Sequence, residues 1–285
     1  MAAEPAIPDA AVLRDVETLA VELATLAGAE IAAALGTMPA VRYKTLPDDA
    51  LRARDPVSEV DHRVETLIRA RLGERFPEHD IIGEEIDARP GRDHDVVWAV
   101  DPIDGTANFV NGFPLYAASI GVLHRGRPIA GAIWCATSHG LRPGVYHARA
   151  GGDLCFDRQP IAPKPNPAVR RGLAGLPDEA PAAGPWDIRR TGSAAIECAL
   201  TAAGILRVSH FAGTNLWDVA AGVALIRASG GEVRLPSGGG WAVMDRFLPM
   251  PGPGGGAADL RNWRSPMVLG RPNDVARMCR ERPPP

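Results

Sequence analysis

Apolar residues recur at helical spacing near the start of the chain and form short unbroken runs in its middle. From Asp9 onward, a spacing of three to four predicts an amphipathic helix that Asp9 caps and that Gly36 and Pro39 end. Ser58 and Asp61 have the spacing of a capping box, which predicts a second helix there. The expected core-facing stripes are Val12, Val16, Leu19, Leu23 and Leu26 in the first helix, and Val60, Val64, Leu67, Ile68 and Leu72 in the second.

The middle of the chain consists of apolar runs of strand length. Residues 96–100 predict a buried strand that ends where Pro102 interrupts the ladder, because proline has no N–H to donate. Residues 117–123 and 129–136 predict an antiparallel hairpin with a slightly long turn. From 159 to 186 no period is convincing, so we expect a long loop between two halves.

The last third of the chain alternates between strand-like and helix-like segments. A helix is expected to open at the small residues of 192–195, and Thr214 or Asn215 caps another that Gly230 stops. The segment 236–258 is rich in glycine and proline and is expected to be irregular and exposed. Helices first, a β-rich middle and this alternation predict a mixed α/β (α+β) fold. The strands expected here are 188–191, 206–211, 232–235 and 267–269.

Composition and charge narrow the classes of function. The 285-residue chain has 31 basic and 34 acidic residues, and its net charge of −3 argues against nucleic-acid or membrane-surface binding through bulk charge. Four widely spaced cysteines form no C-x-x-C pair, which argues against a zinc site and favours a reduced, cytoplasmic setting. The N-terminus lacks the pattern of a signal peptide, and no apolar run is long enough for a membrane span.

The candidate chemistry centres on the stretch 101–109, D-P-I-D-G-T-A-N-F. Asp101 and Asp104 follow a predicted strand, and the backbone amides of Gly105 and Thr106 could face an anion. Clustered carboxylates beside such amides suit a divalent metal and a phosphate, and oxygen ligands without His or Cys favour Mg²⁺ or Mn²⁺ over zinc. An Asp-rich turn is the alternative. It weakens because acids recur in V-S-E-V-D at 57–61, G-E-E at 83–85 and W-D-V-A-A-G at 217–222.

In this order the four motifs resemble the signature of the inositol monophosphatase family of Mg-dependent, lithium-sensitive phosphatases, from about Lys44 to Gly231. The resemblance implies a layered αβαβα sandwich of the inositol monophosphatase and fructose-1,6-bisphosphatase type. It also implies one domain over 1–285, with an N-terminal half at about 1–150 that carries the metal site. The C-terminal half, at about 185–275, would close the substrate pocket. Members of the family usually form homodimers.

The resemblance also implies a role for each matched residue. The implied ligands of two or three Mg²⁺ ions, with Mn²⁺ as a substitute, are Glu84, Asp101, the Ile103 carbonyl, Asp104 and Asp218. The implied catalytic residues are Glu84, Thr106, Asp61 and Asp104: Glu84 and Thr106 would orient the nucleophilic water, and Asp61 would accept the threonine hydroxyl proton. The implied substrate-binding residues are Asp104, Gly105, Thr106, Ser193, Ala194 and Asp218. Lys44 matches a basic residue near the metal site, with Arg52 or Arg54 as alternatives.

Asp61 and Asp218 also have a purely structural alternative. Each lies in the first turn of a predicted helix, where Asp61 would satisfy free N-terminal amides and Asp218 would stabilise the helix dipole, without any metal. We favour the functional interpretation because the other motifs lie in the expected order.

Two positions leave the substrate open. Family members that hydrolyse inositol monophosphates commonly carry Glu and His where this chain has Phe211 and Asn215. Phe211 is expected to be core, or to stack on a base or a flat sugar face. The expected substrate is a small phosphorylated polyol or sugar, with inositol monophosphate first. The alternatives are 3′-phosphoadenosine 5′-phosphate, fructose 1,6-bisphosphate and histidinol phosphate. A metal-dependent binding protein without turnover is a further alternative, which the intact acids and Thr106 disfavour.

Overall fold

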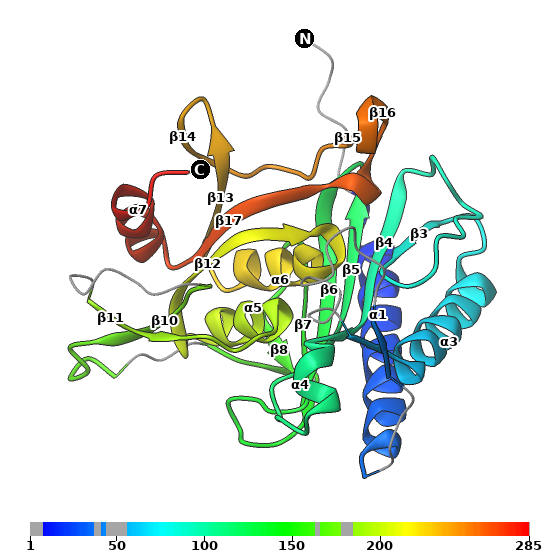
Figure 1. Ribbon diagram of the computed structural model, residues 1–285, viewed down its shortest axis with the longest axis horizontal. Coiled ribbons are helices and arrows are strands. Elements are labelled where there is room, and N and C mark those ends of the chain that lie inside the picture. The colour runs from blue at the N-terminus through cyan, green and yellow to red at the C-terminus, as the bar shows by residue number, and fades with distance from the viewer. Residues whose placement is uncertain (1–7, 37–40, 44–55, 163–165, 178–184, 285) are drawn as a thin grey trace.

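Helices and sheets alternate in five layers. The protein is described by a computed structural model that covers residues 8–36, 41–43, 56–162, 166–177 and 185–284. Helices α1 (Ala10–Ala34) and α3 (Glu59–Arg75) cover one face of a seven-stranded sheet, whose other face packs on α5 (Ala194–Ala202) and α6 (Leu216–Ala228) (Figure 1). A six-stranded sheet lies beyond these two helices, and α7 (Pro272–Glu281) packs on it. The predicted αβαβα sandwich is confirmed.

Both sheets mix parallel and antiparallel pairs. In the first sheet β3 and β4 are parallel and the later pairs antiparallel, whereas in the second β10 is parallel to both β11 and β12. The first sheet contains, in spatial order, β3 (Asp80–Gly83), β4 (Val96–Asp104), β5 (Ala117–His124), β6 (Arg127–Cys135), β7 (Gly144–Arg149), β8 (Cys155–Phe156) and β9 (Gln159–Pro160). The second contains β11 (Trp186–Arg189), β10 (Gly172–Gly175), β12 (Leu206–Asn215), β17 (Arg264–Gly270), β13 (Glu232–Ser237) and β14 (Gly240–Val243). Outside them lie β1 (Val41–Tyr43) with β2 (Pro56–Ser58), β15 (Met250–Gly252) with β16 (Gly256–Asp259), and helix α4 (Thr106–Val110).

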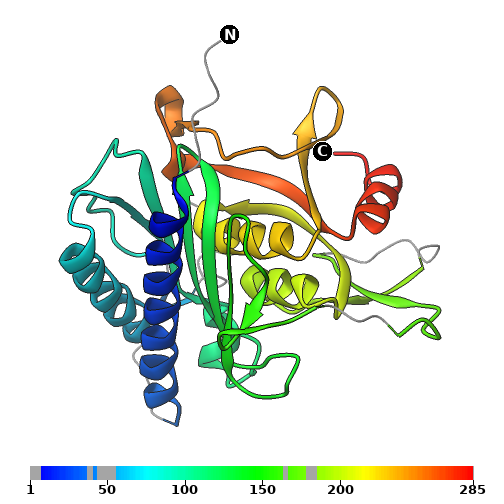
Figure 2. The ribbon, with the colours of Figure 1, turned by 180° about the vertical axis from the view of Figure 1, so that it is seen from behind.

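Helix α1 begins where the sequence predicts, because the Asp9 carboxylate accepts hydrogen bonds from the amides of Ala11 and Val12 at 2.8 and 2.9 Å. It runs along the face of the first sheet (Figure 2). The predicted stripe is confirmed at Val16, Leu19 and Leu23, but Leu26 is only half-buried and Val12 is exposed. The buried stripe is instead in phase with Leu13 and Val16, because the helix turns that side to the sheet.

Helix α6 approaches the first sheet at two glycines. Gly121 of β5 and Gly131 of β6 are paired across the strands. A Cβ at Gly121 would lie 2.6 Å from the Cβ of Ala220, and one at Gly131 would lie 2.6 Å from the Ala221 carbonyl oxygen. Glycine at these positions therefore lets the helix backbone lie directly on the strands, which fixes the start of α6 relative to β4 and β5.

Several predicted boundaries differ from the structure. Strand β4 continues through Pro102 to Asp104, with an irregularity in its pairing with β5 between Asp101 and Asp104. The hairpin turn after His124 is short, not long. Its two residues, Arg125 and Gly126, both have positive φ, the arrangement that matches strand twist in tight hairpins.

Two segments expected to be irregular contain strands. Strand β10, Gly172–Gly175, lies inside the expected long loop, and β11 starts at Trp186 rather than at Ile188. Within 236–258 there are β14, β15 and part of β16, and the Phe247 side chain is fully buried. These segments show no apolar alternation in the sequence, although Ala174 of β10 and Trp186 of β11 lie in a buried hydrophobic cluster. Their strand structure depends on pairing and packing with elements distant in the chain.

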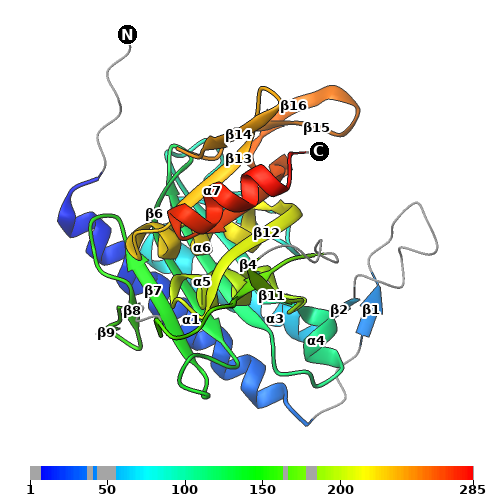
Figure 3. The same ribbon diagram turned by 90° about the vertical axis from the view of Figure 1, so that its left-hand side faces the viewer.

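Helix α7 closes the second sheet by contacting β12, β13 and β17 (Figure 3). Val275 and Met278 are its buried apolar residues, and Asp274 accepts a hydrogen bond from the indole nitrogen of Trp186 at 3.0 Å. None of the helices in the described parts of the chain is both long enough and apolar enough to cross a membrane.

Candidate active site

Asp61 and Thr106 meet at the start of two helices. The Oδ2 atom of Asp61 accepts from the backbone amide of Ser58 at 2.9 Å, which closes the predicted capping box of α3. Its Oδ1 atom accepts from the Thr106 hydroxyl at 3.0 Å. The structural and functional interpretations of Asp61 are therefore compatible, because each uses a different oxygen of one buried carboxylate.

The irregular end of β4 turns its two aspartates in different directions. Asp101 is buried, whereas Asp104 is reached only after the break in pairing with β5. The Asp104 Oδ2 atom accepts from the hydroxyl of Ser193 and the amide of Ala195, each at 2.5 Å. Gly105 then adopts φ +88°, a left-handed conformation that favours glycine, and starts α4 at Thr106. Asp104 is thus tied to the first turn of α5.

Glu84 and Asp218 come from two further elements. Glu84 follows β3, and its amide donates to the carbonyl of Val100 in β4 at 3.1 Å. Asp218 lies in the first turn of α6, and its Oδ2 atom accepts from the Asn215 amide at 2.7 Å in a capping box. The site is therefore built from the end of β3, the end of β4 and the starts of four helices, α3, α4, α5 and α6.

All five predicted metal ligands line one pocket of about 260 Å³. Of the predicted substrate-binding residues, those of the central motif and Asp218 line it too, whereas Ser193 and Ala194 line a neighbouring pocket. The lining residues of this acidic pocket are Glu84, Asp101, Ile103, Asp104, Gly105, Thr106, Ala107, Gly192, Asn215 and Asp218. Lys44, Arg52 and Arg54 lie outside the described residues.

The carboxylates repel one another. Burial raises the pKa of Asp101 well above its ordinary range, and the charges of Glu84, Asp104 and Asp218 raise it further. Burial also raises the pKa of Asp104 to about 6, although hydrogen bonds from Ser193 and from the amides of Ala194 and Ala195 oppose this shift. Clustered, partly desolvated acids of this kind are costly unless a cation neutralises them.

The donor set fits a hard divalent cation such as Mg²⁺. It consists of oxygen atoms, and Asp101 Oδ1 is buried without a hydrogen-bond partner in the described structure. In the same residues no three His, Cys, Asp or Glu side chains are already gathered in a geometry that could hold an ion. One reason is that Asp104 is turned toward α5. The Ile103 carbonyl, water and a substrate phosphate would therefore have to complete the coordination.

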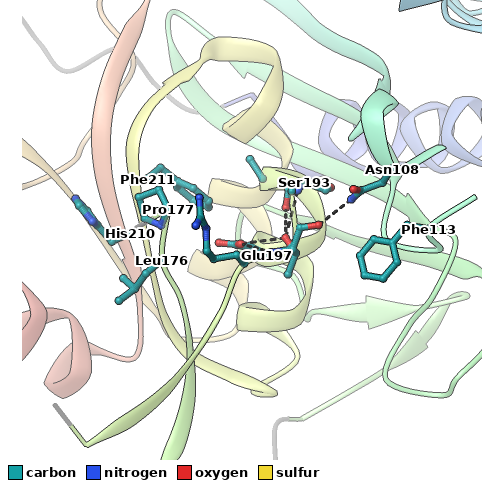
Figure 4. A pocket seen from close by; sticks show the side chains of 12 residues that line it. Asn108, Phe113, Leu176, Pro177, Ser193, Glu197, His210 and Phe211 are labelled. Carbon is teal, nitrogen blue, oxygen red and sulfur yellow. Dashed lines mark hydrogen bonds between the residues drawn. The ribbon is translucent and has the colours of Figure 1, made fainter. Parts of the chain in front are cut away.

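A second pocket, of about 360 Å³, adjoins the first at Gly192 and contains residues that sequence reasoning missed (Figure 4). Asn108, inside the central motif, donates through Nδ2 to the carbonyls of Leu115 and Thr191 at 2.6 and 2.7 Å. Glu197, on α5, belongs to no motif, and no sequence signal could have placed it in the pocket. The lining residues are Asn108, Phe113, Leu176, Pro177, Arg190, Thr191, Gly192, Ser193, Ala194, Glu197, His210 and Phe211.

Comparison with known proteins decides the family. The family model described as "Inositol monophosphatase family" matches residues 12–254. The chain belongs to the inositol monophosphatase family. Its members are phosphoric monoester hydrolases that generally use Mg²⁺.

Two sequence relatives agree with this assignment, and a solved structure shares the fold. Inositol monophosphatase 2 of Homo sapiens is 34% identical over 236 residues, which cover 77% of this chain and 80% of the human protein. The chloroplastic phosphatase IMPL1 of Arabidopsis thaliana is 32% identical over 248 residues, or 80% of this chain, and the match spans 64% of the plant protein. The extragenic suppressor protein suhB of Bartonella henselae has the same fold, with a TM-score of 0.72 at 23% identity over 94% of this chain and 98% of that one.

Proposed function

We propose that this protein is an Mg-dependent phosphomonoesterase that hydrolyses a small phosphorylated polyol or sugar, with inositol monophosphate as the leading candidate. The observation that carries the proposal is the convergence of Glu84, Asp101, Asp104 and Asp218 on one pocket beside the Thr106–Asp61 pair. A phosphate monoester resists attack because its oxygens are negative. Two or three bound Mg²⁺ ions, held by these acids and the Ile103 carbonyl, would supply the missing positive charge.

The protein's own groups divide the remaining work. Glu84 and Thr106 would orient the attacking water. Asp61, whose Oδ1 atom is 3.0 Å from the Thr106 hydroxyl, would accept the proton of that threonine hydroxyl. Gly105 and Thr106 stand at the start of α4, where the first amides of a helix have no acceptor within it, so they would bind phosphate oxygens. This scheme needs no covalent phosphoenzyme.

The test is Mg²⁺-dependent phosphate release from inositol 1-phosphate, 3′-phosphoadenosine 5′-phosphate, fructose 1,6-bisphosphate and histidinol phosphate. EDTA should abolish release, Mn²⁺ should partly replace Mg²⁺, and Li⁺ should inhibit. Turnover of one of these with a clear margin names the substrate. Failure to hydrolyse any of them, with Mg²⁺ still bound, would favour the binding scaffold without turnover.

A nucleotide phosphatase is the second candidate, because aromatic residues line the pocket beside the acidic one. Phe211 is buried in the core and also lines that pocket, and Phe113 lines it with half of its surface exposed. Either ring could stack on a base.

We further propose that the protein is cytoplasmic and forms a homodimer. Sedimentation velocity measures its oligomeric state.

A further inference from the structure

Glu197 stands out in the second pocket because it is a buried acid without a cationic partner. Its side chain is 6% exposed, and in the described residues no Arg, Lys or His forms an ion pair with it. It lies in the first turn of α5 and faces the pocket space between Ser193 and Phe211 (Figure 4). A buried carboxylate normally has its oxygens satisfied by hydrogen bonds or a charge partner.

Only half of this carboxylate is used by the protein. Oε1 accepts from the Thr191 hydroxyl at 2.9 Å and from the Thr191 amide at 3.3 Å. Oε2 accepts no hydrogen bond from any residue that the structure describes. It lies against Gly175, where an added Cβ would come within 2.3 Å of it. Glycine at position 175 therefore leaves room for Oε2, which a side chain there would displace.

The loop beside this acid joins the two pockets. Thr191 is held by Glu197 on one side and by Asn108 of α4 on the other, and Gly192 lines both pockets. One residue later, Ser193 binds Asp104. A substrate whose phosphate occupies the acidic pocket would place its leaving group in the second pocket, within reach of Glu197 and Phe211.

We propose that Glu197 is a specificity-determining residue whose Oε2 atom accepts a hydrogen bond from a hydroxyl of the leaving group. The leaving group would be a cyclic polyol or sugar with one apolar ring face packed on Phe113 or Phe211. This inference rests on the proposed phosphatase function. It explains how a chain with an apolar ring at position 211 still offers a hydroxyl acceptor, from α5 instead of β12.

The test is a double-mutant cycle between protein and substrate. Wild type and Glu197→Gln are assayed at pH 8 with myo-inositol 1-phosphate, its singly deoxygenated analogues and p-nitrophenyl phosphate, which carries no ring hydroxyl. The ratio of kcat/KM for inositol 1-phosphate to that for p-nitrophenyl phosphate should fall about 10- to 100-fold in the variant. One deoxy analogue should show the same loss in the wild type and little further loss in the variant.

Thr191→Val is the matched control. It removes the hydroxyl bonded to Oε1 and leaves Oε2 in place, so it measures the structural role of the loop and should affect both substrates alike. An equal loss on both substrates for Glu197→Gln, or no coupling with any deoxy analogue, overturns the inference and leaves the phosphatase intact. Absence of Mg²⁺-dependent turnover of every substrate in the wild type would instead overturn the proposed function.

Discussion

The Thr106 hydroxyl lies 3.0 Å from Asp61 Oδ1, although 45 positions separate the two residues in the chain. The same hydroxyl lies 2.9 Å from the carbonyl oxygen of Ile103. A hydroxyl has one proton, so it can donate to only one of these acceptors at a time. If the Ile103 carbonyl binds a cation, the Thr106 hydroxyl donates its proton to Asp61 instead. A lone pair of the Thr106 oxygen can then accept a hydrogen bond from the attacking water.

Thr106→Ala should therefore lower kcat about 100-fold or more, with a smaller change in KM, because the hydroxyl that orients the attacking water and connects it to Asp61 is lost from the transition state. Thr106→Ser keeps the hydroxyl and should retain most of the activity. Thr66→Ala is the matched control, since the Thr66 hydroxyl donates to its own helix at the carbonyl of His62. Full activity of Thr106→Ala in steady-state phosphate release would contradict the role.

Asp104→Asn should abolish turnover and leave the fold intact. The amide oxygen can still accept from Ser193 or Ala195, so α5 keeps its attachment, but the charge that would hold a cation is gone. Phosphate release, Mg²⁺ titration calorimetry and thermal unfolding measure the three effects. Asp153→Asn, at an exposed position, is the control. An active variant, or one that merely fails to fold, would count against the assignment.

Asp101→Asn should stabilise the metal-free protein by about 1 kcal/mol, because it removes a buried acid whose ionised form is disfavoured by burial and by three other carboxylates. In wild type, Mg²⁺ at about 100 times its Kd should add about 2.7 kcal/mol. That increment should be largely absent in the variant. Urea unfolding in EDTA and in Mg²⁺ measures both, and an unchanged Mg²⁺ increment in the variant would remove Asp101 from the ligands.

His79 should make the protein less stable as pH falls. Burial, aided by the charge of nearby His94 and opposed by that of Glu78, lowers the pKa of His79 from 6.5 to about 4. Its Nδ1 accepts from the Trp98 indole nitrogen at 3.0 Å, which requires the neutral ring. Between pH 6.5 and 4 the unfolded chain binds the proton more readily, so this contribution is present above 6.5 and is lost toward 4.

The expected loss is about 1–2 kcal/mol, reduced from the full shift because the ring is partly solvated. His79→Gln keeps an acceptor for Trp98. In urea unfolding it should remove the contribution of His79 to the difference in the free energy of unfolding between pH 7.5 and 5.0. Comparison with wild type cancels the other titrating groups. His62→Gln, at an exposed histidine of α3, should behave as wild type. An unchanged slope for His79→Gln would contradict the prediction.

Gly131→Ala should destabilise the protein by about 1–3 kcal/mol, because its Cβ would lie 2.6 Å from the Ala221 carbonyl oxygen and push α6 from the sheet. Gly73→Ala is the matched control. Its Cβ would meet nothing within 4 Å in helix α3, so it should stabilise by about 0.5–1 kcal/mol. Chemical unfolding measures the free energy of unfolding of both variants. Equal changes would show that helix α6 moves to accommodate the added Cβ at little cost and would contradict the prediction.

The sequence by itself determined the elements that depend on local physics. The Asp61 capping box and the Asp9 cap are completed within one helical turn, so their pattern is visible in the chain. The apolar runs of β4 to β6 are contiguous in the sequence and are visible for that reason. The order of the acidic motifs is also visible in the sequence, and it predicted the acidic residues of the pocket and the family.

The tertiary structure alone decided what depends on partners distant in sequence. Strand β10 exists because it pairs with β11 and β12, and the irregularity before Asp104 lies in the pairing of β4 with β5, which the sequence of β4 does not show. Glu197 reaches the second pocket only because α5 packs beside Thr191 and Gly175. Side-chain direction and pairing across layers have no local signature, since they arise from packing one face of an element against another.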